Sequence, residues 1–247
     1  MDDSRGIWTS TTDLDLLLRL AGSGFDWVAL DAQHGPLDRG HLYAVARGLV
    51  TARVPFLVRV PAVDPAWIGA ALDAGAAAVV VPSATGLADA EVAARATRYP
   101  PAGERSWGQF APLWGGEAAT PDAADAAARC WVMVETPGAL ADVDEIAAVA
   151  GVDGLFVGPL DLARSLGTTV EALLTDDSGD GPIARVVAAA RRHGILVGAF
   201  AGTPGNARRL GALGIRCLAV TTDVAVVAEG VRSVLAALDR DADGGSP

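Results

Sequence analysis

The stretch WVMVETPGALADVDEIAAVAGVDGLFVGPLDLARSLG, residues 131–167, holds two short apolar runs with a helical pattern between them. WVMVE (131–135) is typical of a buried strand, and GLFVGP (154–159) is typical of a second one. A strand–helix–strand unit places its two strands parallel and side by side. Each strand is then followed, at the same edge of the sheet, by one acid, Glu135 and Asp161. Because a carboxylate at the end of a buried strand is costly without a partner, the pair predicts a bound cation.

The same alternation of apolar runs and helical patterns extends along the whole chain. The expected strands are near-continuous apolar runs, as parallel strands covered on both faces must be. They lie at 6–9, 25–31, 55–60, 76–82, 131–135, 154–158, 195–200 and 217–222. Helical patterns lie at 11–20, 39–51, 64–74, 85–97, 121–129, 139–149, 183–193, 204–213 and 223–238. This order predicts an α/β protein, a single (β/α)8 TIM barrel.

The predicted barrel domain covers residues 1–240, and the polar tail at 241–247 is expected to be disordered. Two irregular stretches interrupt the alternation. Residues 99–120 form a long loop that contains Trp107 and Trp114, and the Gly/Asp-rich residues 168–181 predict a surface insertion.

Composition excludes several classes of protein. The 247 residues are 51% hydrophobic and 20% charged, which is typical of a globular chain, and no apolar run approaches the ~20 residues of a membrane-spanning helix. The net charge of −11, from 19 basic and 30 acidic residues, argues against nucleic acid or an anionic membrane as a partner. The first residues, MDDSRGIW, do not resemble a signal peptide, and Cys130 and Cys217 are predicted to be small buried residues, so we expect a cytoplasmic protein.

The chemistry of a (β/α)8 barrel lies where strands end and helices begin. Asp31, Gln33 and His34 follow the second expected strand, and Arg59 lies near the end of the third. Two carboxylates and water suit a hard divalent ion such as Mg²⁺ or Mn²⁺. An arginine offers a fixed positive charge to an oxyanion, and a histidine can move a proton near pH 7.

Each of these residues also has a purely structural interpretation. Glu135 could form a salt bridge within the barrel, and Asp161 could cap a helix. His34 could be an ordinary loop residue, and Arg59 could be a structural ion-pair partner. Their shared location on one predicted rim favours a functional site.

Several longer motifs carry a resemblance to a known family. They include GFDWVALDAQHGP (24–36), LVRVP (57–61), RYPPAGERSWG (98–108) and the segment from Val134 to Gly167. The sequence resembles the HpcH/HpaI aldolases, metal-dependent (class II) pyruvate aldolases that include 2,4-dihydroxyhept-2-ene-1,7-dioate aldolase and 2-keto-3-deoxy-sugar-acid aldolases. The resemblance implies a TIM barrel of the phosphoenolpyruvate/pyruvate type and a divalent metal ion, Mg²⁺, Mn²⁺ or Co²⁺.

The resemblance also implies roles for individual residues. Glu135 and Asp161 match the metal ligands, and His34, acting near Asp31, matches the active-site base. Arg59 matches the residue that stabilises enolate and alkoxide charge.

Asp73 matches an aspartate that raises the basicity of the histidine, although its place in the chain is a helix end, away from the predicted rim. The residues expected to contact substrate are Arg59, Leu160, Met133, Gln33 and Pro159. Met133 and Gln33 depart from the family pattern, which has glutamine and glutamate there. Met133 makes its wall apolar and therefore bears on the choice of substrate.

The predicted function is that of a carbon–carbon lyase (an aldehyde-lyase). It would reversibly cleave a 4-hydroxy-2-oxo acid to pyruvate, or a close 2-oxo acid, and an aldehyde. The chain contains no lysine, which excludes an aldolase that works through a lysine imine.

Two alternatives stay open. A citrate or CoA-thioester lyase of the same superfamily would need a basic phosphate-binding cluster, which the sequence does not show. A barrel used only for binding or assembly would bind metal without turnover. The family resemblance further implies a homo-oligomer, typically a hexamer built as a trimer of dimers, with the C-terminal helices exchanged between subunits.

Overall fold

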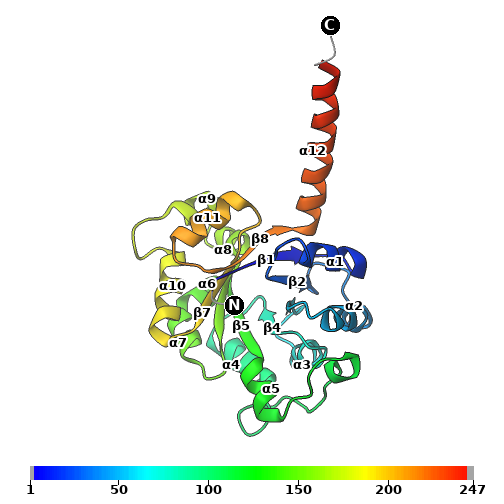
Figure 1. Cartoon of the computed structure of the whole chain (residues 1–247). Helices are drawn as coiled ribbons and strands as arrows, with labels where there is room; N and C mark the ends of the chain where they lie inside the picture. The colour runs from blue at the N-terminus through cyan, green and yellow to red at the C-terminus, as the bar shows by residue number, and fades with distance from the viewer. Residues whose placement is uncertain (1–2, 244–247) are drawn as a thin grey trace.

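A computed structural model describes residues 3–243 as a closed barrel of parallel strands (Figure 1). Each strand pairs with its neighbour in the chain, and the first pairs with the last. The strands are β1 (Ser4–Thr9), β2 (Trp27–Asp31), β3 (Phe56–Arg59), β4 (Ala78–Val81), β5 (Arg129–Val134), β6 (Gly154–Val157), β7 (Leu196–Phe200) and β8 (Cys217–Thr222). The predicted (β/α)8 barrel is confirmed, with strand ends shifted by no more than a few residues.

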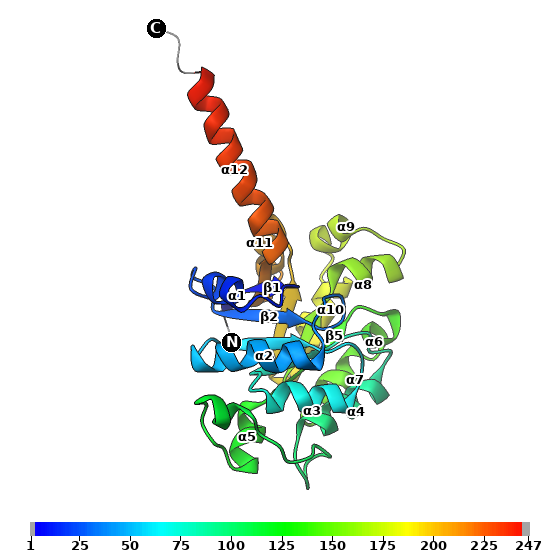
Figure 2. The same cartoon turned by 90° about the vertical axis from the view of Figure 1, so that its right-hand side faces the viewer.

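Helices follow the strands, and most of them cover the outside of the barrel (Figures 1 and 2). They are α1 (Leu14–Ala21), α2 (Arg39–Thr51), α3 (Pro65–Asp73), α4 (Leu87–Thr97), α5 (Pro121–Ala127), α6 (Pro137–Ala141), α7 (Val143–Ala148), α8 (Pro159–Ser165), α9 (Val170–Thr175), α10 (Pro182–His193), α11 (Pro204–Ala212) and α12 (Asp223–Asp243). A short 3-10 helix, η1 (Ala111–Trp114), lies within the long predicted loop.

Three predicted segments differ from the structure. The single helix expected at 139–149 is two helices, α6 and α7, because Asp142 leaves the helical conformation and accepts a hydrogen bond from the backbone of Leu87. The stretch 168–181 is not wholly irregular, since Thr169 caps α9 within it. Helix α12 continues to Asp243, past the predicted boundary at 240, while residues 244–247 of the predicted tail lie outside the described residues.

Large aromatic side chains fill the inside of the barrel. Trp27 and Trp131 are fully buried there, together with Phe156. Glycines on other strands make the space: a Cβ on Gly6 would lie 2.1 Å from the ring of Trp27, and one on Gly198 would lie 2.5 Å from the ring of Trp131. The packed interior therefore closes the barrel below its upper rim and leaves the strand ends as the place for a cavity.

Helix α12 extends away from the barrel in both views (Figures 1 and 2). Its side chains Val227, Val231, Val234 and Leu238, predicted to share one face, are 52 to 62% exposed. An apolar stripe of this length on an extended helix is unusual for a chain that acts alone. Within residues 3–243, no helix combines the length and apolar character needed to cross a bilayer.

Candidate active site

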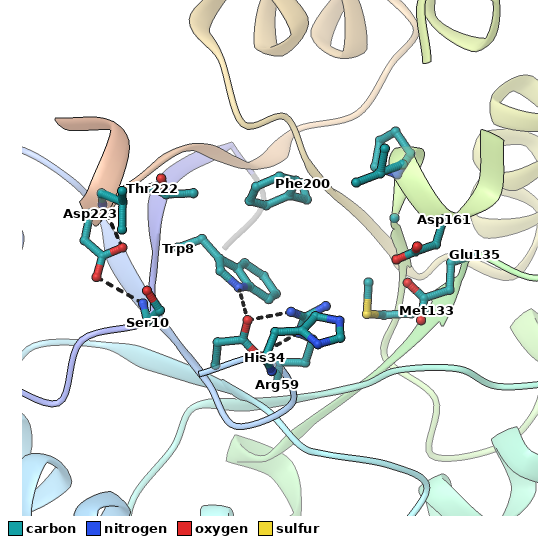
Figure 3. A pocket seen from close by; sticks show the side chains of 15 residues that line it. Trp8, Ser10, His34, Arg59, Met133, Glu135, Asp161, Phe200, Thr222 and Asp223 are labelled. Atoms are coloured by element: carbon teal, nitrogen blue, oxygen red, sulfur yellow. Dashed lines mark hydrogen bonds and ion pairs between the residues drawn. The ribbon is translucent and has the colours of Figure 1, made fainter. Parts of the chain in front are cut away.

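A cavity of about 380 Å³ lies at the carboxyl ends of the strands (Figure 3). Its walls come from both halves of the barrel, with side chains from β1, β2, β3, β5, β7 and β8 and from the starts of α8 and α12. The lining residues are Trp8, Ser10, Asp31, His34, Arg59, Met133, Glu135, Gly158, Pro159, Leu160, Asp161, Phe200, Thr222, Asp223 and Val224.

A buried ion pair joins the ends of β2 and β3. The register places Asp31 directly beside Arg59, whose Nε donates to Asp31 Oδ1 at 3.0 Å and whose Nη2 donates to Oδ2. Trp8 Nε1 donates to the same carboxylate at 3.2 Å, and the guanidinium lies 5.1 Å from the centre of the Trp8 ring. Burial acts to raise the pKa of Asp31, but the hydrogen bonds and charge of Arg59 outweigh it and hold the pKa below its usual range. The Asp31 carboxylate is therefore ionised and fixed against the Arg59 guanidinium.

The loop after β2 is held by the same aspartate. The backbone N–H groups of Gln33 and His34 donate to Asp31 Oδ1 at 3.0 and 3.1 Å. His34 is exposed and lines the cavity, as predicted from its position. Gln33 instead turns its amide toward Ser83, at 3.3 Å, and is not among the residues that line the cavity. Asp31 thus orients the histidine through the backbone of the loop.

Glu135 follows β5 directly and is only 5% exposed. Its Oε1 accepts the backbone N–H of Ser83 at 2.6 Å, and Ser83 adopts a φ of 56° that is rare for a residue with a side chain. Its Oε2 is buried and has no hydrogen-bond partner. Burial raises the pKa of Glu135, and the nearby charge of Asp161 raises it further. A buried carboxylate oxygen beside a second carboxylate is the environment that a cation would relieve.

Gly158 gives the carboxylate of Glu135 its space. A Cβ at this position would lie 2.6 Å from Glu135 Oε2 and 3.1 Å from Met133 Cε. Asp161 lies in the first turn of α8, where it is exposed, and Figure 3 shows it next to Glu135 and Met133. The main chain at 158–161 therefore brings the second acid close to the first.

The acid pair suits a hard divalent ion. In the described part of the chain, no group of three or more His, Cys, Asp or Glu side chains is arranged to hold a metal. Two carboxylates with one free buried oxygen are consistent with an ion that takes its other oxygen ligands from substrate and water, as Mg²⁺ commonly does. The donor set therefore fits such an ion.

Trp8, Phe200 and Asp223 line the cavity but were not predicted as site residues. The rings of Trp8 and Phe200 pack edge to face, with their centroids 5.7 Å apart. Asp223 accepts the backbone N–H groups of Ser10 and Thr11 at 3.0 and 2.9 Å, which ties the end of β1 to the start of α12. Trp8 and Phe200 lie at or just before the carboxyl end of an expected strand, and Asp223 directly follows one, so the strand-end rule applied to every residue type would have found them.

Asp73 lies elsewhere. It is the last residue of α3 and forms an ion pair with Arg105 at 2.7 Å. It is absent from the cavity that contains His34, because a helix that follows a barrel strand runs back toward the opposite end of the barrel. Within this chain the structure does not support the action on His34 that the resemblance implies.

A closed parallel barrel with such a cavity at its strand ends defines the class of (β/α)8-barrel enzymes. Residues 5–229 match the family model described as HpcH/HpaI aldolase/citrate lyase, and the chain belongs to this family. The predicted family membership is confirmed.

Individual relatives agree with the family match. The chain is 37% identical to a 4-hydroxy-2-oxovalerate aldolase of Novosphingobium aromaticivorans, over 77% of this chain and 74% of the relative. It is 34% identical to a hydroxypyruvate/pyruvate aldolase of Paraburkholderia phytofirmans, over 93% of this chain and 91% of that protein. The crystal structure of an HpcH/HpaI aldolase/citrate lyase family protein from Burkholderia cenocepacia J2315 superimposes with a TM-score of 0.85 at 33% identity, over 96% of this chain and 95% of the other.

Proposed function

We propose that the chain is a metal-dependent pyruvate aldolase. It cleaves a 4-hydroxy-2-oxo acid reversibly to an aldehyde and pyruvate, or a close 2-oxo acid such as hydroxypyruvate. The observation that carries the proposal is the unpartnered, buried Oε2 of Glu135 beside Asp161, across the cavity from Arg59 (Figure 3). The relatives named as aldolases of these oxo acids support the choice of substrate class.

Glu135 and Asp161 would hold the divalent ion, which we propose to be Mg²⁺, Mn²⁺ or Co²⁺. When bound, the ion supplies Lewis acidity to the 2-oxo acid. The chain contains no lysine that could form an imine instead.

Arg59 and His34 supply the remaining chemistry. Asp31 accepts from two of the N–H groups of the Arg59 guanidinium, which holds its charge at the cavity wall to stabilise enolate and alkoxide oxygen. In the synthetic direction, a methyl proton of pyruvate passes to water, C3 of the resulting enolate forms a bond to the aldehyde carbon, and the aldehyde oxygen takes up a proton. His34, on the exposed side of the cavity, would deliver that proton and remove it in cleavage.

Leu160, Pro159 and Met133 would contact the substrate, Leu160 through its backbone. Gln33 would act from further away, through Ser83 and the loop that carries His34. The acidic lining disfavours the phosphates of a CoA thioester, because the one arginine in it is already paired with Asp31.

Exchange of the methyl protons of pyruvate in D₂O, followed by NMR, tests the proposal without knowledge of the aldehyde. We expect exchange with Mg²⁺, Mn²⁺ or Co²⁺ and its loss in EDTA. Full exchange in EDTA would contradict the metal mechanism. No exchange of pyruvate or hydroxypyruvate with any ion, under conditions where the ion binds, would favour a barrel used for binding alone.

Gly158→Ala is expected to weaken the binding of the metal ion. The new Cβ would lie only 2.6 Å from Glu135 Oε2 and would therefore displace this oxygen. Loss of such support typically costs 10- to 100-fold in metal affinity, so the Mn²⁺ concentration for half-maximal exchange should rise about tenfold or more. Gly69→Ala is the control, because a Cβ there meets nothing within 4 Å. An unchanged Mn²⁺ requirement in Gly158→Ala would show that Glu135 is not a ligand.

The exposed stripe on α12 supports a homo-oligomer, which we propose to be a hexamer, a trimer of dimers, with α12 packed on a second copy. Sedimentation should give a mass above that of the 25.0 kDa chain. Val231→Asp, at a position that is 54% exposed in the isolated chain, should lower the mass. A monomeric wild type would contradict the proposal.

A further inference from the structure

The cavity carries more negative charge than its proposed function needs. Among residues 3–243, four acids line it, Asp31, Glu135, Asp161 and Asp223, against one arginine and the single histidine His34. Arg59 is committed to Asp31, and a divalent ion would balance Glu135 and Asp161. Asp223 then remains, and the carboxylate of the 2-oxo acid adds a further negative charge. No fixed cation among the described lining residues is left for a second carboxylate on the substrate.

One stretch of the cavity wall is apolar. Trp8 and Phe200 form one wall, and Leu160 and Val224 stand at its edge, 59% and 66% exposed. A small pocket of about 90 Å³ adjoins the cavity and shares Phe200, Leu160 and Pro159 with it. Its further walls include Val170, Leu174 and Leu210.

We infer that the aldehyde partner is uncharged and carries an apolar tail, which lies over Leu160 and Phe200 toward this small pocket. The inference rests on the proposed function and names the substrate class that the same site would select. An acceptor with a terminal carboxylate would contact apolar side chains and acids that no cation balances. Repulsion between these like charges would strongly disfavour its binding.

Two aldehydes of nearly the same shape distinguish the effect of charge on kcat/KM from the effect of size. In 4-oxobutanoate the chain ends in a carboxylate, and in 4-methylpentanal it ends in an isopropyl group. With pyruvate and Mn²⁺ as constant partners, formation of the adduct is measured for each by NMR. We expect kcat/KM to favour 4-methylpentanal by about tenfold or more.

A charge added to the apolar wall should shift this preference. Leu160→Arg places a cation beside the expected tail and should move the kcat/KM ratio at least about tenfold toward 4-oxobutanoate. Leu166→Arg, at the end of the same helix and outside the cavity, adds the same charge and should leave the ratio unchanged. Both sites are exposed, 59% and 37%, so both variants should fold.

Methyl-proton exchange of pyruvate, measured in every sample, separates the two proposals. Normal exchange in a wild type that accepts 4-oxobutanoate as well as 4-methylpentanal would overturn the inference and leave the aldolase proposal standing. Normal exchange and an unchanged ratio in Leu160→Arg would overturn the placement of the tail. Absence of exchange with every ion would overturn the aldolase proposal and, with it, the inference.

Discussion

Glu135→Gln is expected to reduce metal-dependent pyruvate exchange by about 10²- to 10³-fold or more, the range observed when one charge-stabilising group is lost from an active site. Glutamine has the shape of glutamate and can still accept the Ser83 N–H through its Oε1. What disappears is the negative charge on Oε2, the atom that has no partner in the chain. The measured quantities are the exchange rate and the Mn²⁺ concentration that it requires.

The same substitution should stabilise the metal-free protein. Burial and the charge of Asp161 raise the pKa of Glu135, so its ionised form is less favourable in the folded chain than in the unfolded one. Well below the ordinary pKa of 4.5 the group is protonated in both states, and its ionisation does not affect the free energy of unfolding. As the pH rises through the higher folded pKa, this ionisation lowers the free energy of unfolding progressively. In EDTA, the Tm of Glu135→Gln should exceed that of the wild type by a margin that grows over this window.

Glu145→Gln serves as the matched control, because Glu145 lies exposed in α7. It should leave the exchange rate and its Mn²⁺ requirement unchanged. A Glu135→Gln variant that exchanges pyruvate like the wild type would remove the central residue from the proposed mechanism.

Arg59→Met is expected to lower both activity and stability. Exchange should fall about 10²- to 10³-fold with the loss of the positive charge at the cavity wall. Removal of one partner from a buried ion pair typically costs about 3–5 kcal/mol. Asp31 keeps hydrogen bonds from Trp8 and from two backbone N–H groups, so we expect a value of about 3 kcal/mol, measured by chemical denaturation.

The pH dependence identifies the source of this loss. The pKa of Asp31 is depressed in the folded protein, so its contribution to stability is present above the ordinary value of 3.8 and is lost as the pH falls through the lower folded pKa. In Arg59→Met the arginine no longer offsets the effect of burial on the pKa of Asp31. The contribution of the depressed pKa to the free energy of unfolding is therefore lost. The difference in unfolding free energy between wild type and variant should therefore narrow as the pH falls through this range.

Arg98→Met breaks a different ion pair, between Arg98 and Asp153 at 2.7 Å, outside the cavity. It should also lose stability but retain exchange within about twofold, as expected for independent sites. Equal losses of exchange in the two variants would show that Arg59 acts through stability alone.

The barrel was predictable from sequence because its strands are apolar runs with a different period from the helices that cover them. Position at a strand end was enough to place Asp31, His34, Arg59, Glu135 and Asp161 around one cavity. That rule needs only the topology, since parallel strands end at one edge.

Other features depend on three-dimensional packing that no local pattern encodes. From sequence alone, Trp8 and Phe200 are indistinguishable from core residues. They line the cavity only because they lie at the rim of the barrel. Ser83 contributes through a backbone N–H whose direction depends on an unusual φ. The motif around Asp73 indicated a site residue, yet the direction of α3 carries it to an ion pair with Arg105.

The pairing of β1 with β8, reinforced by Asp223 on the N–H groups of Ser10 and Thr11, has a consequence for biosynthesis. A nascent chain that has not yet released residues 217–223 leaves both β1 and β7 as open sheet edges. It also lacks the wall of the cavity that Thr222 and Asp223 provide. The catalytic cavity is therefore complete only after the last strand has been synthesised. A chain terminated before residue 217 would have two unpaired strand edges, which are prone to aggregation, and an incomplete cavity.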